Sequence, residues 1–373
     1  MPAIPVSSPG GGQRGSRPLS DAVDVGAADD PVTAVLEAHD AGRLIALRTS
    51  GTTGRPRAVL RSPGSWVCSF DTVASLTGLE AESRMWLPGP MSSTMNLFAA
   101  TLARSVGATV VANHADASHA HLTPSALLRA LDDRLDLTGR HVTVAGDRLP
   151  RRIRERAEGA GAVVSHYYGA AELSFVAWGL DEEVLRAFPG VELGVRSGEI
   201  WVRSPYLCQG YDDQAGALAG VPADVPAAPG PLRRDADGFA TVGDRGALVD
   251  GVLTVAGREG DAVVTGGATV LVADVEGALR PGLAGDVVVV GVPHPSLGRV
   301  VVAALTDPGD LPAAHRHAQE HLVPAQRPRR WFHVSALPLT DAGKVDRDAL
   351  TGEVTGPGAV RLVPRRRTAL ESR

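Results

Sequence analysis

The spacing of apolar and polar residues predicts a chain of strands and helices that alternate. Short apolar runs have the length of buried strands, and they lie at 44–47, 108–112, 141–145 and 162–164. Elsewhere apolar residues recur at helical spacing, which predicts helices at 31–41, 65–76, 96–106 and 125–135. Nearer the C-terminus the pattern predicts strands at 286–292 and 300–305 and a helix at 312–322.

One stretch predicts how the strands are paired. A strand at 141–145, a basic helix at 151–158 and a strand at 162–164 form a β-α-β unit. Such a unit implies a parallel sheet with a right-handed crossover, so the pattern predicts an α/β fold. Ligands of parallel sheets lie at the carboxyl ends of the strands. The loops 146–149 and 166–172 follow two of these strands and are therefore candidates for a ligand site.

Segments without periodicity mark the two ends and one insertion. Residues 1–30 are rich in Pro, Gly, Ser and Asp, so we expect a disordered tail. Residues 353–373 include three consecutive arginines, and we expect a basic disordered tail there. Residues 214–236 are rich in Ala, Pro and Gly and are predicted to be a surface insertion.

Composition excludes several classes of protein. Of 373 residues, 44% are hydrophobic and 21% are charged, which is typical of a soluble globular chain with room for two domains. The net charge of −5 gives no reason to expect nucleic acid, and no apolar run approaches the ~18 residues of a membrane helix. Cys68 and Cys208 lack metal-site spacing, so we expect buried thiols in a reducing compartment. Since the first 30 residues also lack a signal-peptide core, we expect a cytoplasmic protein.

The densest candidate chemistry lies in the stretch 47–57. Within it, residues 50–57 combine two glycines, three hydroxyls and two arginines, namely Gly51, Gly54, Ser50, Thr52, Thr53, Arg55 and Arg57. The glycines let backbone N–H groups approach an anion, and the other side chains add donors and positive charge. Such a loop suits a polyphosphate. Taken alone, the same stretch could equally be a polar surface turn.

Two further groups of polar residues have less specific patterns. His114, His119 and His121 lack a carboxylate partner and define no metal geometry, so we expect solvated histidines rather than a metal site. Ser92, Ser93 and Thr94 precede the helix predicted at 96–106, where hydroxyls can cap the helix N-terminus.

The stretch 49–57 resembles the phosphate-binding loop of the AMP-forming adenylating enzymes, which include acyl-CoA synthetases, luciferases and peptide-synthetase adenylation domains. Further segments match this superfamily in its order. They are Tyr168–Glu172, Gly198–Arg203, Gly243–Asp244 with Gly257–Arg258, and Leu337–Arg347. Because the ordered matches extend over residues 44–350, the resemblance covers most of the chain.

The resemblance implies a set of ATP contacts. The phosphates would lie against Thr49, Ser50, Gly51, Thr52, Thr53, Gly54 and Arg57. The adenine would lie between Gly146, Asp147 and Arg148 on one side and Tyr167, Tyr168, Gly169 and Ala170 on the other, with Tyr168 stacked on the base. Asp244 would bind both ribose hydroxyls, since a carboxylate accepts two hydrogen bonds, and Arg258 would reach the ribose and phosphate.

The resemblance also implies two catalytic residues. Glu172 would lie near Mg²⁺, a hard cation that takes oxygen ligands. The alternative is a carboxylate favoured by a helix N-terminus. Lys344 would bridge the acid and the α-phosphate of ATP and stabilise the charge of the transition state. Its alternative is an exposed surface lysine. Where the family usually has threonine before the glutamate, this chain has Ala171, which removes one hydroxyl contact.

Two domains follow from the same resemblance. Residues 31–257 would form a large domain of mostly parallel sheets flanked by helices, which binds ATP and substrate. Residues 258–352 would form a small mobile α+β domain that turns at Gly260, because glycine tolerates the change in backbone angles.

The resemblance also indicates where the acid would bind. In many acyl-CoA synthetases a histidine or aromatic residue lies near the acyl and thiol sites. Here the residues of the expected substrate pocket are Ser92, Ser93 and Thr94.

The implied activity is that of an ATP-dependent, AMP-forming ligase with ATP and Mg²⁺ as cofactors. It would activate a small or aromatic acid and pass it to a second nucleophile, most often the CoA thiol. The short N-terminal region resembles that of o-succinylbenzoate–CoA ligases. It also suits ATP-dependent diazotases of secondary metabolism, which activate nitrite and pass it to an arylamine. A non-catalytic adenylate-binding protein is the third hypothesis. The sequence predicts no nucleic-acid or membrane partner and leaves the oligomeric state open.

Overall fold

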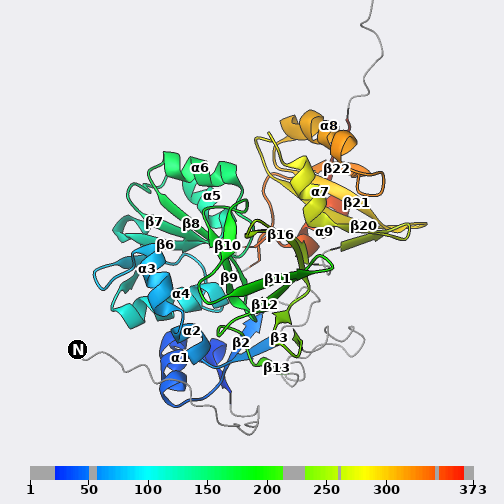
Figure 1. The fold of residues 1–373 in the computed structure, drawn as a ribbon. Coiled ribbons are helices and arrows are strands. Elements are labelled where there is room, and N and C mark those ends of the chain that lie inside the picture. Colours follow the sequence, from blue (N-terminus) through cyan, green and yellow to red (C-terminus); the bar gives the residue numbers. More distant parts are fainter. Residues whose placement is uncertain (1–21, 50–56, 213–231, 259–261, 341–343, 365–373) are drawn as a thin grey trace, which may run out of the picture.

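The computed structural model describes residues 22–49, 57–212, 232–258, 262–340 and 344–364. These residues form three sheets flanked by helices (Figure 1). The α/β fold class expected from the sequence is confirmed. None of the helices in the described part of the chain has the length and apolarity that crossing a bilayer requires.

The first sheet carries the strands on either side of the expected phosphate loop. Its order is β1-β2-β3-β13, with β1 Val23–Asp24, β2 Ile45–Thr49, β3 Arg57–Arg61 and β13 Gly210–Asp212. The 3-10 helix η2 (Val25–Ala27) and α1 (Pro31–Asp40) precede β2. The prediction of a disordered tail over all of 1–30 is wrong from Ala22 onward, because Val25 is buried and β1 pairs with β2.

The second sheet is large and mixed. One half is parallel in the order β8-β7-β6-β4-β5, as the β-α-β pattern predicts. These strands are β4 Arg84–Trp86, β5 Thr109–Val111, β6 His119–Leu122, β7 His141–Val144 and β8 Val163–Ala170, with the 3-10 helix η3 (His114–Asp116) before β6. The expectation of a buried strand at 108–112 is wrong, because β5 is an edge strand with no buried residue. Residues 166–170 form the end of β8 and are not a loop.

Helices cover both faces of this parallel half. One face packs on α2 (Gly64–Val67), α3 (Phe70–Thr77) and α4 (Thr94–Val106), and the other on α5 (Pro124–Asp132) and α6 (Arg151–Gly159). The helix predicted over 65–76 is two helices, since the Ser69 hydroxyl bonds to the Trp66 carbonyl at 2.7 Å and competes with the helical ladder. Thr123 caps α5 with its side chain and Pro124 follows at its first turn, as expected.

The other half of the large sheet is antiparallel. Its strands are β9 Ser174–Gly179, β10 Leu185–Ala187, β11 Glu192–Arg196, β12 Glu199–Arg203, β14 Arg233–Arg234, β15 Ala240–Thr241, β16 Asp244–Val249 and β17 Val252–Arg258. Most of the insertion expected at 214–236 lies outside the described residues. Cys208 is buried as expected, whereas Cys68 is exposed, so the expectation for Cys68 is wrong.

The third sheet, with its helices, forms what we call the small unit, residues 262–364 (yellow to red in Figure 1). Its elements are β18 Ala262–Thr265, β19 Ala268–Leu271, α7 Val272–Leu279, β20 Val287–His294, β21 Gly298–Leu305, η5 Pro308–Asp310, α8 Leu311–His321, β22 Arg330–His333, α9 Arg347–Thr355 and β23 Val360–Leu362. Alternate valines of β20 face α7 and α8 on one side and α9 on the other, which gives the unit two apolar layers. The prediction of a disordered tail from residue 353 onward is wrong up to residue 364, because β23 pairs with β22.

Candidate active site

Glu172 lies in the turn between β8 and β9, and several contacts fix its position. Gly169 is required before this turn, because a Cβ there would clash with the carbonyl oxygen of Ser174. Oε1 of Glu172 accepts a hydrogen bond of 2.9 Å from the Tyr211 hydroxyl, and only 8% of the residue is exposed. No helix begins here, since β9 follows, so the helix N-terminus alternative is wrong. A buried carboxylate with one hydrogen bond from the described residues keeps oxygen lone pairs for a hard cation.

Arg61 braces this turn from behind and was missed by the sequence reasoning. Its Nη2 donates to the Ala171 carbonyl oxygen at 2.8 Å, and its Nη1 donates to Oγ of Ser65 at 2.8 Å. The guanidinium also lies 5.3 Å from the ring centre of Trp66. Complete burial lowers the pKa of Arg61 to about 10, so the side chain stays charged at neutral pH. Arg61 shares a strand face with the core residue Val59, so the alternating pattern gives no sign of a buried charge.

Tyr168 and Asp244 are joined directly. The Tyr168 hydroxyl donates a hydrogen bond of 2.6 Å to Oδ2 of Asp244, which is 7% exposed. Asp244 begins β16 and is the register partner of Arg258 at the end of β17. The structure therefore brings the residue expected under the adenine next to the one expected at the ribose. It also places the backbone of Arg258 beside them, while its side chain lies outside what is described.

The expected phosphate loop connects two paired strands. Thr49 ends β2, Arg57 begins β3, and these two residues are register partners. Ser50, Gly51, Thr52, Thr53 and Gly54 lie outside the described residues. The loop ends are nevertheless tied to Glu172, because β3 pairs with β13 and Tyr211 of β13 donates to the Glu172 carboxylate.

Lys344 of the small unit lies beside Gly146 of the large sheet. A Cβ placed on Gly146 would be 3.5 Å from Cε of Lys344, 3.5 Å from Cγ2 of Thr123 and 3.9 Å from Sδ of Met95. Lys344 is exposed on a short hairpin in which Leu339 pairs with Val345 and the Thr340 N–H donates to the Lys344 carbonyl oxygen at 2.8 Å. It is also the only lysine in the sequence, against 37 lysines and arginines together. The side chain of one exposed lysine therefore lies at the carboxyl end of β7.

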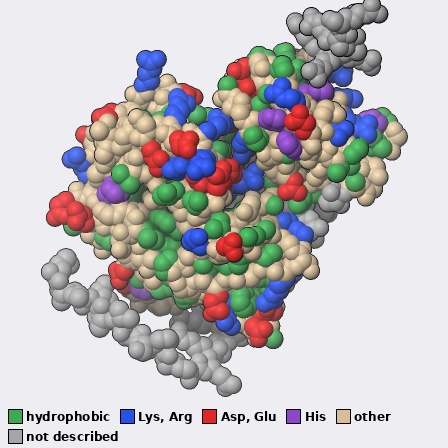
Figure 2. Space-filling model, turned by 45° about the horizontal axis from the view of Figure 1, so that its top comes forward, with side chains coloured by type: hydrophobic (Ala, Val, Ile, Leu, Met, Phe, Trp, Pro, Cys, Tyr) green, Lys and Arg blue, Asp and Glu red, His purple; other side chains and the backbone are tan. Residues whose placement is uncertain are grey.

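The segment after Gly146 holds the small unit in place. Arg148 donates to the carbonyl oxygens of Val255 at 3.2 Å and of Ala273 in α7 at 3.3 Å. Arg152 forms an ion pair of 2.7 Å with Asp286 of the small unit. Charged side chains of both signs lie side by side where the two parts meet (Figure 2). Burial at this junction raises the pKa of Asp274, an effect that Arg148 opposes. Asp147 is exposed, and its carboxylate accepts from the N–H of Arg148.

Tyr167 and Tyr168 point to different surroundings. The Tyr167 ring lies in the core, stacked on Trp178 with 5.5 Å between ring centres, and burial raises the pKa of its hydroxyl. Any contact of Tyr167 with a nucleotide must therefore be made by its backbone.

The expectation of solvated histidines is wrong for His119 and His121, because both are buried in β6. His119 is held by the Thr77 carbonyl oxygen at 3.0 Å. Nε2 of His121 has no hydrogen-bond partner among the described residues.

Ser92, Ser93 and Thr94 lead into α4. Ser93 stands at the N-cap, but its side chain makes no capping hydrogen bond, so the capping interpretation is wrong for this hydroxyl. Met95, the second residue of α4, reaches the Gly146 position, so the three hydroxyls lie at the start of an element that touches the candidate site.

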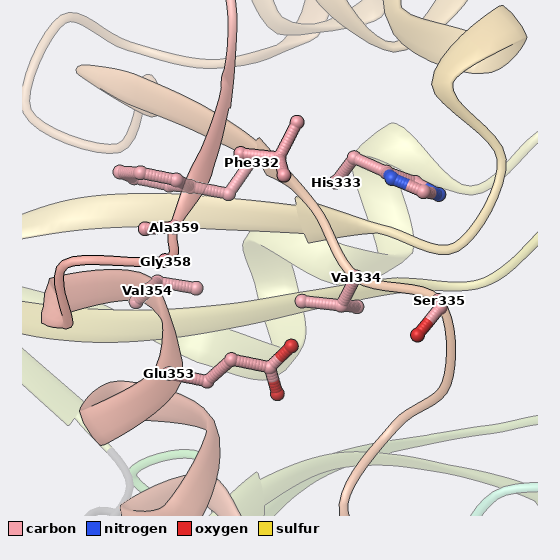
Figure 3. A pocket seen from close by; sticks show the side chains of 9 residues that line it. Phe332, His333, Val334, Ser335, Glu353, Val354, Gly358 and Ala359 are labelled. Atoms are coloured by element: carbon pink, nitrogen blue, oxygen red, sulfur yellow. The ribbon is translucent and has the colours of Figure 1, made fainter.

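Two cavities differ in their relation to this site. One, of about 310 Å³, lies in the small unit between β22, α9 and β23, and its polar residues His333, Ser335 and Glu353 are spread around it (Figure 3). No expected nucleotide or catalytic residue lines it, so it is not part of the site. The other, of about 20 Å³, lies between α4 and the parallel half of the large sheet. Among the described residues, no three metal-ligating side chains gather in one place.

Comparisons with known proteins show the family and the fold of this chain. Residues 29–212 match the family described as AMP-binding enzymes. A protein of Mycobacterium tuberculosis named as a probable 2-succinylbenzoate–CoA ligase is 30% identical over 348 residues, which cover 84% of this chain and 85% of that protein. The crystal structure of ATP-bound MatB from Rhodopseudomonas palustris superposes with a TM-score of 0.69 at 21% identity, over 85% of this chain and 69% of that one. A variant of MenE from E. coli with bound OSB-AMS gives 0.68 at 23%, over 84% and 69%.

Proposed function

Because this chain belongs to the family of AMP-binding enzymes and is an AMP-forming ligase, we propose that it activates a small or aromatic carboxylic acid with ATP and passes it to the thiol of CoA. The proposal includes the roles of the residues expected to bind ATP and to catalyse the reaction.

The reaction has two steps. In the first, an oxygen of the carboxylate attacks the α-phosphorus of ATP, the bond to the β-phosphate oxygen breaks, and pyrophosphate leaves. In the second, the CoA sulfur attacks the acyl carbon, the carbon–oxygen bond of the acyl–phosphate anhydride breaks, and AMP leaves as the thiol proton is lost to solvent. Negative charge grows around the α-phosphate in the first step, so a fixed cation there lowers the barrier.

Lys344 supplies that cation. The observation that carries the proposal is the position of its Cε, next to Gly146 at the carboxyl end of β7, where a parallel sheet binds its ligands. A lysine ammonium is a compact charge on a flexible stem, which suits a bridge between a carboxylate oxygen and a phosphate. It is held there by a hairpin of the small unit, so it moves with that unit.

The other residues position ATP. Tyr168 stacks on the adenine, Asp244 accepts the ribose hydroxyls, and Arg258 reaches the adjoining phosphate. The residues 49–57 hold the phosphates. Glu172 and the phosphate oxygens would hold Mg²⁺, which neutralises phosphate charge when bound. The fit rests on the buried carboxylate of Glu172, whose one hydrogen bond of 2.9 Å from Tyr211 leaves further lone pairs.

The two steps need two arrangements of the chain. We propose that residues 31–257 and 258–352 act as two domains that turn about Gly260, which lies outside the described residues. The arrangement described here, with Lys344 beside Gly146, is the one for the first step. Turning the small unit would withdraw Lys344 and admit the second nucleophile, as conformational steps do in many enzymes.

The acceptor is proposed from the name of the Mycobacterium tuberculosis relative, which is a CoA ligase. Pyrophosphate release from ATP tests the proposal with a panel of small and aryl carboxylic acids, each with and without CoA. We expect pyrophosphate release that depends on the acid and a thioester that forms only with CoA. Nitrite with an arylamine forms a separate arm. Turnover there, without any response to carboxylic acids or CoA, would identify a diazotase, and an inactive but ATP-binding protein would point to a non-catalytic role.

A further inference from the structure

A small cavity is lined by residues of two elements, β6 and α4, that also contribute residues to the candidate active site. Its walls come from α3 and α4 on one side and from β6, β7 and β8 on the other. Three of its lining residues, His121, Thr143 and Tyr167, stand on adjacent parallel strands and face the same helices. The volume of about 20 Å³ has room for one water-sized group and no more.

His121 is the unusual member of this lining. It is 5% exposed, and its Nε2 is buried without a hydrogen-bond partner among the described residues. A buried polar atom left without a hydrogen-bond partner destabilises the fold, so native structures rarely keep one without a use. Burial lowers the pKa of His121 to about 4, which leaves a neutral imidazole at pH 7. A neutral ring nitrogen can donate or accept according to its tautomer.

The cavity and the site share two elements. On β6, His121 precedes Thr123 by two residues, a rise of about 6–7 Å, and Thr123 contacts the Gly146 position. On α4, Ala99 of the cavity lies about one turn beyond Met95, which also contacts that position. Met95 and Ala99, four residues apart, therefore share one face of α4. The unbranched side chain of Met95 has three rotatable bonds and can move aside for a ligand.

We infer that His121 selects the acid substrate: its Nε2 binds a hydroxyl group at the end opposite the carboxylate, so the preferred acid is a small aromatic acid with a hydroxyl in the para position. This inference rests on the proposed function and names its substrate class. With the carboxylate near Lys344, a benzene ring spans the layer that Met95 now occupies. Tyr167, Phe175 and Phe98 around the cavity suit the ring edge, and the cavity itself holds only the hydroxyl.

The test compares benzoate with 4-hydroxybenzoate by pyrophosphate release in three proteins: the unmodified chain, His121→Leu and His121→Gln. The unmodified protein should favour 4-hydroxybenzoate at least tenfold in kcat/KM, because a site built to bind a hydroxyl disfavours the analogue without it. His121→Leu should reduce this ratio at least tenfold, mainly by loss with 4-hydroxybenzoate. His121→Gln keeps a hydrogen-bonding group and should retain part of the preference. Because both kcat/KM values are measured on the same protein, their ratio does not depend on the fraction of the protein that is folded.

His166 gives a matched control. It is also a buried histidine of this sheet with its pKa lowered to about 4, but its Nδ1 is bonded to the Val144 carbonyl oxygen at 3.0 Å and it does not line the cavity. His166→Leu should leave the ratio unchanged. An unmodified protein that uses both acids equally, or a ratio that His121→Leu does not alter, overturns the inference while the proposed ligase activity stands. No pyrophosphate release with any carboxylic acid overturns both.

Discussion

The Tyr168 hydroxyl donates a hydrogen bond of 2.6 Å to the Asp244 carboxylate, although β17, β10 and β9 lie between their strands in the order of the large sheet. A flat sheet would hold two such strands far apart, so the sheet curls and closes one wall of the candidate site. The bond fixes the ring expected under the adenine relative to the carboxylate expected at the ribose.

Tyr168→Phe should therefore weaken ATP binding and leave the chemical step nearly intact. The phenylalanine ring can still stack on the base, but Asp244 loses the donor that orients it. We expect KM for ATP to rise about three- to tenfold, equivalent to the roughly 1 kcal/mol of a typical intramolecular hydrogen bond, with kcat changed less than twofold. Steady-state kinetics of pyrophosphate release measure both constants. An unchanged KM would show that this bond does not organise the nucleotide site.

Lys344→Ala should reduce the first step by about 100- to 1,000-fold, since removing one preorganised charge contact costs about 2.7–4 kcal/mol. Because Lys344 is exposed, the free energy of unfolding should not change. Urea unfolding provides that control. A variant that releases pyrophosphate at the unmodified rate would remove Lys344 from the mechanism.

The single lysine allows a second measurement on the unmodified chain. An amine-reactive reagent can modify only Lys344 and the N-terminal amine, so mass spectrometry reports on one side chain without mutation. ATP together with an activated acid should protect Lys344 from modification. Equal labelling with and without these ligands would contradict a position beside the α-phosphate.

Arg152→Ala should slow the first step by a few-fold at most. The Arg152–Asp286 ion pair of 2.7 Å is partly exposed, and such pairs contribute up to about 1 kcal/mol. Its loss should reduce the population in which Lys344 lies at Gly146. Arg151 is the matched control, because it pairs with Glu155 and Glu183 and not with the small unit. Arg151→Ala should have no effect on pyrophosphate release. Equal effects of the two variants would contradict a role for the junction.

Stability should fall as the pH is lowered from about 6.5 to 4. Burial lowers the pKa of both His121 and His166 to about 4, below the ordinary histidine value of 6.5. In this window the unfolded chain binds protons that the folded chain does not, so the free energy of unfolding decreases by about 1.4 kcal/mol per pH unit for each histidine. Urea unfolding across the window measures the slope, and His121→Leu should remove one histidine's share. A variant with the unmodified slope would show that His121 titrates normally.

The sequence predicted the parallel strands and their helices well because local signals specify them. Thr123-Pro124 marks the start of α5, and the β-α-β spacing specifies the pairing of β7 with β8. It failed where burial depends on distant partners. The valines of β5 look like a core strand, yet no further strand covers that edge. His119 and His121 look like loop residues, but α3 and α4 cover them.

In the candidate site, too, the local motif could be predicted from the sequence and the contacts between distant segments could not. The motif containing Glu172 is visible in the sequence, whereas its support by Arg61 and Tyr211 depends on the contact of two sheets that are remote in the chain. The alternation of apolar and polar residues does not predict that Arg61 in β3 is fully buried. The position of Lys344 beside Gly146 likewise follows from how the small unit sits on the large sheet, and not from either segment alone.

The segment from Gly146 to Arg152 does two things at once. Its first residue borders the place proposed for ATP, and two of its three arginines, Arg148 and Arg152, contact the small unit. Any ligand that favours one conformation of this segment must therefore change the affinity of the two parts for each other, and the coupling is reciprocal. Tightening the junction from outside, for example with an antibody fragment that binds across it, should raise the affinity for ATP by the same factor by which ATP raises the affinity for the fragment.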